Sequence, residues 1–242
     1  MKKILVFILA VALLCTIAVG TTLTYFTDTD FDANTMTVGK VEIVQNEKDR
    51  TGADFVDAKL YPYTGVGGDA GKTTQYGTYN MFDADKNAID KIVTVTLDAN
   101  SEKAFVRTIF AFEANGTNNA VGSLIHLNYN ADASVGKWEQ CLDTNNNPIT
   151  YKKTVAGVET VYYLYSFTYA AAYSAGNTTA PSLLQFYLDS QAENEFSGGS
   201  YEILAVSQAV QAKGFDTAAA AFAAAFPYGE NNSNVAGWFA NN

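Results

Sequence analysis

Aspartates at alternate positions are the clearest candidates for metal chemistry in this sequence. Two segments reproduce the first three ligand positions of an EF-hand calcium loop: Asp28, Asp30, Asp32 and, further along, Asp83, Asp85, Asn87. Such a loop also needs glycine at its sixth position and glutamate at its twelfth. The first segment has Ala33 and Gly39 there, and the second has Ala88 and Thr94. We therefore predict no metal site and keep Asp28, Asp30 and Asp32 only as weak calcium candidates.

Histidine chemistry is limited to a single residue. His126 lies in the apolar run LIHLNY, which favours a hydrogen-bonded strand residue over a catalytic one. Zinc hydrolases use several histidines, often as HExxH, and a GxSxG elbow marks many serine hydrolases. Neither motif occurs, and Ser123 is too near His126 in sequence to be informative. The stretch Gly71–Thr73 also lacks the earlier glycine of a phosphate-binding loop, with Val66 in its place. We predict no catalytic residue and no cofactor, and hence a protein that is not an enzyme.

The amino terminus has the pattern of an export signal. Lys2 and Lys3 precede an apolar run from Ile4 to Val19, and Thr22-Leu23-Thr24 offers a small-x-small cleavage pattern. We predict cleavage between Thr24 and Tyr25, with cleavage after Ala18 as the alternative. A retained membrane anchor is a second alternative, but no positive flank follows Val19. A secreted chain without a stable membrane anchor is the expectation.

Cleavage changes both the cysteine content and the charge. Cys15 would leave with the signal, so Cys141 remains alone and no intrachain disulfide can form. Either Cys141 is an inert buried thiol or it links two chains. Without Lys2 and Lys3 the basic residues number 15 − 2 = 13, and 13 − 25 acidic residues gives a net charge of −12. Nucleic acid is therefore excluded as a partner, because binding phosphates needs a basic surface.

The remaining 242 − 24 = 218 residues read as an all-β domain. Short apolar runs rich in Thr, Tyr, Val and Phe alternate with turn residues, which predicts seven strands: Thr37–Gln45, Lys91–Leu97, Ala104–Glu113, Leu124–Tyr129, Glu159–Ala170, Ser182–Asp189 and Tyr201–Gln211. Each of the second and third strands has one face that is more apolar than the other. The polar link DANSE between them predicts that these two strands pair antiparallel.

One helix is expected near the carboxyl end. Alanines dominate the segment from Thr217 to Phe226, Asp216 can cap its start, and Pro227 with Gly229 ends it. Its small side chains suit close packing on a sheet.

Four segments together resemble a known family. They are TYFTDTDFDANTMTVGKVEI from Thr24, KIVTVTLDANSEKAFVRTIFAFE from Lys91, SAGNTTAPSLLQFYLD from Ser174 and SYEILAVSQAVQAKGF from Ser200. In this order they are similar to the TasA and camelysin (CalY) family of Gram-positive surface and biofilm-matrix proteins. Between Leu60 and Ala88 the chain departs from the family, being longer and carrying YPYTG in place of a Pro-Gly turn.

The resemblance implies a fold and a way of assembling. The expected fold is a jelly-roll-like sandwich of two antiparallel sheets over residues 37–242, with the short helix near its end. Residues 1–24 would be a signal peptide cut by a SipW-type signal peptidase, and residues 25–36 would donate a strand to the neighbouring subunit. As a strand, the donor places Tyr25, Thr27, Thr29 and Phe31 on one face, and Phe26, Asp28, Asp30 and Asp32 on the other.

The implied function is that of a secreted structural protein at the cell surface or in the extracellular matrix. It would polymerise head to tail into biofilm-matrix fibres, with an accessory fibre protein as a further partner. Two alternatives stay open. The camelysin branch suggests a cell-surface metallopeptidase, and the Tyr- and Asn-rich loops suggest a monomeric surface adhesin.

Overall fold

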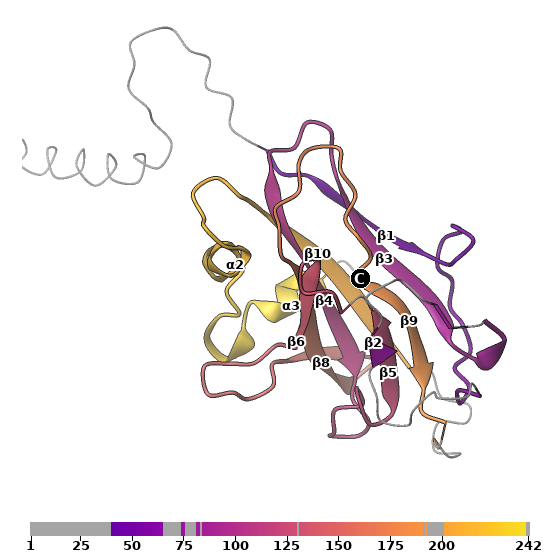
Figure 1. Cartoon of the computed structure of the whole chain (residues 1–242). Helices are drawn as coiled ribbons and strands as arrows, with labels where there is room; N and C mark the ends of the chain where they lie inside the picture. Colours follow the sequence, from indigo (N-terminus) through magenta and orange to yellow (C-terminus); the bar gives the residue numbers. More distant parts are fainter. Residues whose placement is uncertain are drawn as a thin grey trace, which may run out of the picture. The chain divides into compact units, whose positions relative to one another are not determined.

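The computed structural model describes residues 40–64, 74–75, 81–82, 84–129, 131–190, 192 and 201–240. The chain divides into two units, Met1–Val38 and Gly39–Asn242, and the first lies wholly outside the described residues. Within the second unit, the described strands form two five-stranded sheets that pack face to face (Figure 1).

The first sheet has the order β1-β3-β9-β5-β2. Its strands are β1 (Ile43–Lys48), β2 (Thr74–Gln75), β3 (Ile89–Leu97), β5 (Ile125–Tyr129) and β9 (Leu183–Leu188). The pairs β1–β3, β3–β9 and β5–β9 are antiparallel, and the two-residue β2 pairs parallel with the end of β5. Thus β1 and β2 are the edge strands of this sheet.

The second sheet has the order β10-β4-β8-β6, with β7 paired to the other half of β8. Its strands are β4 (Ala104–Glu113), β6 (Gly136–Gln140), β7 (Thr150–Val155), β8 (Val158–Tyr169) and β10 (Ile203–Gln211). All its pairs are antiparallel. The predicted fold class, a jelly-roll-like sandwich with a short C-terminal helix, is confirmed.

The predicted pairing of the second and third strands with each other is wrong. Those strands are β3, which pairs with β1 and β9, and β4, which pairs with β10 and β8. The link Asp98–Lys103 crosses from one sheet to the other, starting with a turn in which Asp98 accepts the Asn100 N–H at 2.8 Å. The reason lies in the core, where Val93, Val95 and Leu97 of β3 pack across the sandwich against β4 rather than beside it.

The more apolar face of each of these two strands lies on the main core, but the burial of the other face differs between them. In β3 buried and half-buried residues alternate, whereas in β4 every residue but the last is buried. Val106, Phe110 and Phe112 of β4 point into the main core. The opposite face of β4 is covered by the C-terminal segment: Phe105 packs on the helix α2 (Ala218–Ala225), and Ile109 packs with α3 (Val235–Trp238) (Figure 1).

Other differences from the prediction are local. Thr217, not Asp216, caps α2, since its hydroxyl accepts the Ala220 N–H at 3.2 Å. The first described strand begins at Ile43, residues 40–42 are not strand, and residues 37–39 lie outside the described part. Strands β6 and β7, with the sequences GKWEQ and TYKKTV, were not predicted, because edge strands half exposed to water lack an apolar run. The one-turn elements α3 and η3 (Glu230–Asn232) were also missed.

Candidate functional site

The edges of the two sheets are the surfaces that strand addition could use. An edge strand presents a row of main-chain N–H and C=O groups to any strand that approaches it. In the described residues these edges are β1 and β2 in the first sheet, and β10, β6 and β7 in the second. The main-chain directions of these strands and their neighbours decide which edge is open.

Alternate residues of β10 point their main-chain N–H and C=O groups away from β4, toward the open side of the sheet. Glu113 donates its N–H to the Glu202 carbonyl at 3.2 Å, and Ala212 donates to the Lys103 carbonyl at 2.8 Å. The even-numbered positions that flank β10 on both sides thus bond to the last residue of β4 and to the residue before its first. Since hydrogen-bonded and non-bonded pairs alternate in an antiparallel ladder, the odd-numbered residues Ile203, Ala205, Ser207, Ala209 and Gln211 point their N–H and C=O groups outward.

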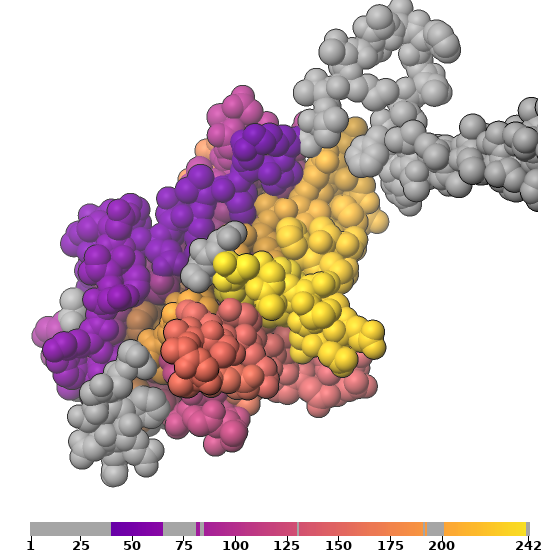
Figure 2. All heavy atoms as spheres, turned by 180° about the vertical axis from the view of Figure 1, so that it is seen from behind, coloured from indigo at the N-terminus to yellow at the C-terminus, as the bar shows by residue number. Residues whose placement is uncertain are grey.

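The two sheets meet at this side of the sandwich, where β1 lies beside β10. Gln45 of β1 donates its amide N–H to the Ala205 carbonyl at 3.2 Å and accepts the Ser207 hydroxyl at 2.6 Å. Seen from behind, the indigo segment that contains β1 borders the gold segment that contains β10 (Figure 2). We call this line of contact the β1–β10 seam. Here the hydrogen bond to the outward C=O of Ala205 comes from a side chain and not from a neighbouring strand.

The predicted N-terminal site residues lie outside the described part of the chain. They are the cleavage pair Thr24 and Tyr25, the donor-strand residues Tyr25, Phe26, Thr27, Thr29 and Phe31, and the calcium candidates Asp28, Asp30 and Asp32. Their predictions therefore stay predictions.

The second aspartate segment serves the fold in its described part. Asp83 lies outside the described residues, and Asp85 belongs to the short helix η1 (Ala84–Lys86). Asn87 has a φ of 64°, and its side-chain amide donates to the Pro62 carbonyl at 2.9 Å, a hydrogen bond within the fold. In the ranges described, no group of three or more His, Cys, Asp or Glu side chains is placed to hold a metal ion.

His126 and Cys141 are both inside the protein. His126 lies in β5 with no exposed surface, and its Nε2 is 2.8 Å from Asp189 Oδ2. The Ser123 hydroxyl donates to the carbonyls of Asn119 and Ala120. Cys141 is a free thiol with 3% of its surface exposed, and burial raises its pKa above the usual value. This burial favours the inert thiol over a link between chains.

A buried arginine, which the sequence reasoning missed, holds the C-terminal segment on the second sheet. Arg107 of β4 is 7% exposed and donates from Nε to Gln208 Oε1 at 2.8 Å. Its guanidinium lies 4.5 Å from the Phe222 ring centroid and 5.5 Å from that of Trp238, both cation–π distances. Burial lowers the pKa of this guanidinium. The signal in the sequence was an arginine within the otherwise apolar run AFVRTIF.

A second missed cluster combines tyrosines and carboxylates near the start of β10. Tyr162 donates its hydroxyl to Glu202, and Lys153 donates to both oxygens of Glu202 at 2.8 and 3.0 Å. Tyr201 donates to the Glu113 carbonyl at 2.5 Å. Burial, with nearby carboxylates, raises the pKa of Tyr162 and of Tyr201. Burial also tends to raise the pKa of Glu202, but the bonds from Lys153 and Tyr162 outweigh it, so this pKa is lowered overall.

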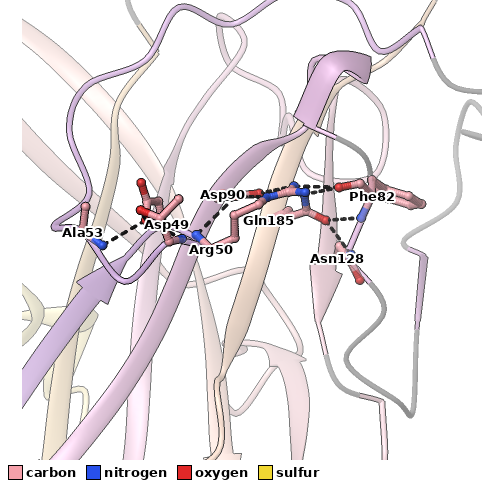
Figure 3. A network of polar contacts seen from close by, with 8 residues as sticks. Asp49, Arg50, Ala53, Phe82, Asp90, Asn128 and Gln185 are labelled. Carbon is pink, nitrogen blue, oxygen red and sulfur yellow. Dashed lines mark hydrogen bonds and ion pairs between the residues drawn. The ribbon is translucent and has the colours of Figure 1, made fainter.

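A third polar network crosses the first sheet from β3 to β5 (Figure 3). Gln185 of β9 is fully buried and uses both ends of its amide. Its nitrogen donates to Asp90 at 2.8 Å and to the Phe82 carbonyl at 3.2 Å, and its oxygen accepts from the Phe82 N–H at 2.7 Å and from Asn128 at 2.9 Å. Arg50 joins the network by bonding Asp90 with two guanidinium nitrogens. The network fastens the segments around Arg50 and Phe82 to the sheet.

These clusters hold segments of the fold together, and the sheet edges are the candidate functional site in the described residues. Among the described helices, none has the length and apolar character needed to cross a bilayer. Compared with models of protein families, with curated proteins and with solved structures, the chain has no significant match.

Proposed function

We propose that this protein is a secreted structural subunit that polymerises into extracellular matrix fibres, each copy donating its N-terminal segment to the next. The observation that carries the proposal is that both sheets of the sandwich end on edge strands in the described residues. A sandwich with open edges can take up one more strand, and the segment Tyr25–Asp32 has the alternating pattern of such a strand.

The energetics favour a docked main chain over docked side chains alone. Burying Tyr25 and Phe31 contributes about 1.5 to 3 kcal/mol each. Ordering the eight residues from Tyr25 to Asp32 costs about 1 to 2 kcal/mol of backbone entropy per residue. The side chains cannot offset that cost, so the hydrogen-bond ladder of a preformed sheet edge must supply the difference. A sheet edge on a rigid sandwich is a partner of this kind.

The same mechanism explains fibre growth and its timing. Donation from one copy to the next is a heterologous contact, which propagates into a fibre unless the rotation closes it into a ring. Before cleavage, Tyr25 would continue the apolar signal segment and be held by the membrane. Cleavage by a SipW-type signal peptidase would release the strand only after export, so fibres would form outside the cell.

The test compares two aromatic substitutions of equal size. Phe31→Ser removes an anchor from the apolar face of the donor, and Phe26→Ser removes the same ring from the aspartate-bearing face. We expect negative-stain electron microscopy to show fibres from the wild type and Phe26→Ser, and few or none from Phe31→Ser. Mass spectrometry of each secreted chain checks that cleavage still falls before Tyr25.

Three results would contradict the proposal. A wild-type protein that elutes as a monomer in size-exclusion chromatography at every concentration would favour the adhesin alternative. Casein cleavage that stops with a chelator would favour the metallopeptidase. Normal fibres from a variant lacking Tyr25–Asp32 would exclude donation by this segment.

A further inference from the structure

Strand β10 lacks the features that protect the other edges from strand addition. Natural edge strands carry charges, especially lysine, or are short or bulged, because an unprotected edge pairs with other chains. Charged side chains occur in every other edge strand longer than two residues: Glu47 and Lys48 in β1, Lys137 and Glu139 in β6, Lys152 and Lys153 in β7. The nine residues of β10, ILAVSQAVQ, include none, and they pair with β4 without a register shift.

We propose that β10 is the edge that accepts the donor strand of a second copy, and that Gln45 guards this edge until the donor arrives. This proposal rests on the proposed function, since it names the receiving surface for the same strand. The guard is the pair of bonds from Gln45 to the Ala205 carbonyl and the Ser207 hydroxyl. An incoming strand would replace that single side chain with a ladder along the outward groups of β10.

The lengths of donor and acceptor agree. At a rise of about 3.3 Å per residue, the eight residues Tyr25–Asp32 extend over about 26 Å and the nine of β10 over about 30 Å. A donor strand would therefore cover nearly the whole edge. The two-residue β2 and the five-residue β6 offer much shorter ladders.

The side chains of β10 also suit an aromatic donor face. Its odd-numbered residues point toward the main core, and two of them are the small residues Ala205 and Ala209. Tyr25 and Phe31 are six residues apart and the two alanines four, so a strand beside β10 can place one of the rings next to an alanine and the other next to Ile203 or Gln211 on the same face. The opposite face of the donor, with Asp28, Asp30 and Asp32, would then face away from the core.

The described chain begins at the same seam. The Lys40 carbonyl accepts the Glu102 N–H at 2.9 Å, next to Lys103, whose carbonyl accepts from Ala212 just beyond the end of β10. Seven residues, 33–39, connect Asp32 to Lys40, and they span at most about 25 Å. The first described residue of each copy thus lies near that copy's own acceptor edge, and donation through the same seam could repeat from copy to copy.

Proline substitution tests the edge without touching the β4 ladder. The Ala209 N–H points outward, so Ala209→Pro removes a donor and adds a ring on the open side only. Thr154→Pro is the matched control, because the Thr154 N–H points outward from the edge strand β7 in the same way. Leu164 of β8 donates its N–H to the carbonyl of Ile149, just before β7, so the odd-numbered residues of β7 bond to β8 and the even-numbered ones point outward. We expect Ala209→Pro to raise the critical concentration for fibres about tenfold or more, equivalent to about 1.4 kcal/mol. Thr154→Pro should polymerise like the wild type.

The outcomes separate the two proposals. Wild-type protein that never forms fibres refutes the proposed function itself. Fibres that form equally well from wild type and Ala209→Pro refute β10 as the acceptor while leaving donation intact. Fibres lost equally from Ala209→Pro and Thr154→Pro also refute it. Circular dichroism of each monomer shows whether the variant is folded.

A cross-linking measurement decides the matter if Ala209→Pro fails to fold. The donor carries Phe31→benzoyl-phenylalanine, and fibres grown from mixed ¹⁵N-labelled and unlabelled copies are irradiated and digested. We expect cross-links between labelled and unlabelled copies that map to β10 or to β1 across the seam. Cross-links to β6 or β7, or only within one copy, would overturn the proposal.

Discussion

Asp90→Asn should weaken the sandwich measurably, because Asp90 is the hub of the network on the first sheet. Its side chain is 11% exposed and accepts from Gln185 at 2.8 Å and from Arg50 Nη2 at 2.8 Å, with a further bond from Arg50 Nε. The substitution keeps the shape but removes the charge. It also turns one carboxylate oxygen into an N–H donor that faces the donors of Arg50.

The expected magnitude follows from the bonds lost. A hydrogen bond to a charged partner contributes about 1.5 to 3 kcal/mol, and Arg50, with 33% of its side chain exposed, recovers part of its solvation from water. The remaining loss is about 2 to 3 kcal/mol in the free energy of unfolding. For a domain of this size each kcal/mol shifts Tm by about 2 to 4 °C, so we expect a fall of about 4 to 12 °C.

The assay is urea unfolding of the secreted protein, with Asp54→Asn as the control. Asp54 pairs with Lys48, but its side chain is 85% exposed, and such surface pairs contribute about 0 to 1 kcal/mol. Asp54→Asn should therefore leave the unfolding midpoint almost unchanged. A loss below about 0.5 kcal/mol for Asp90→Asn, or equal losses for both variants, would show that the network does not stabilise the fold as argued.

Two further predictions concern the seam and the tyrosine cluster. Gln45→Ala should lower the critical concentration for fibres up to about tenfold, because the donor no longer displaces hydrogen bonds of about 1 kcal/mol each to Ala205 and Ser207. Light scattering measures the critical concentration, and slower growth than wild type would contradict the guard role of Gln45. The raised pKa values of Tyr162 and Tyr201 mean that the unfolded chain ionises first, at its usual pKa near 10.0. Stability is therefore full below pH 10 and should fall above it. Urea unfolding at pH 9 and pH 11 checks this, and Tyr162→Phe should reduce the difference; an unchanged difference in that variant would refute the assignment.

The sequence predicted the strands that have strong patterns and missed those that do not. Ala104–Glu113 was predicted with its true bounds, and β3, β5, β8, β9 and β10 were each predicted to within two residues of theirs at both ends. Dense runs of β-branched and aromatic residues mark these strands, because they lie in or beside the core. The edge strands β6 and β7 carry lysines and few apolar residues, so local composition does not distinguish them from loops.

The error over β3 and β4 shows what local pattern leaves open. A polar link after one strand indicates that the chain turns, but a hairpin and a crossing between sheets begin with the same turn residues. Packing decides between a hairpin and a crossing here, since β4 buries both of its faces, one on the core and the other under the C-terminal segment. Arg107 belongs to the same contact, and its role depends on rings that follow it by more than a hundred residues.

By itself, the sequence determined the all-β class, the short alanine helix and the alternation of the N-terminal segment, because each depends on neighbours a few residues apart. Only the tertiary structure decided which strands lie at the edges, which main-chain groups point outward, and that Gln45 reaches Ala205. A strand is an edge strand when no other strand pairs with it on one side. That property belongs to the whole sheet, and no stretch of residues encodes it alone.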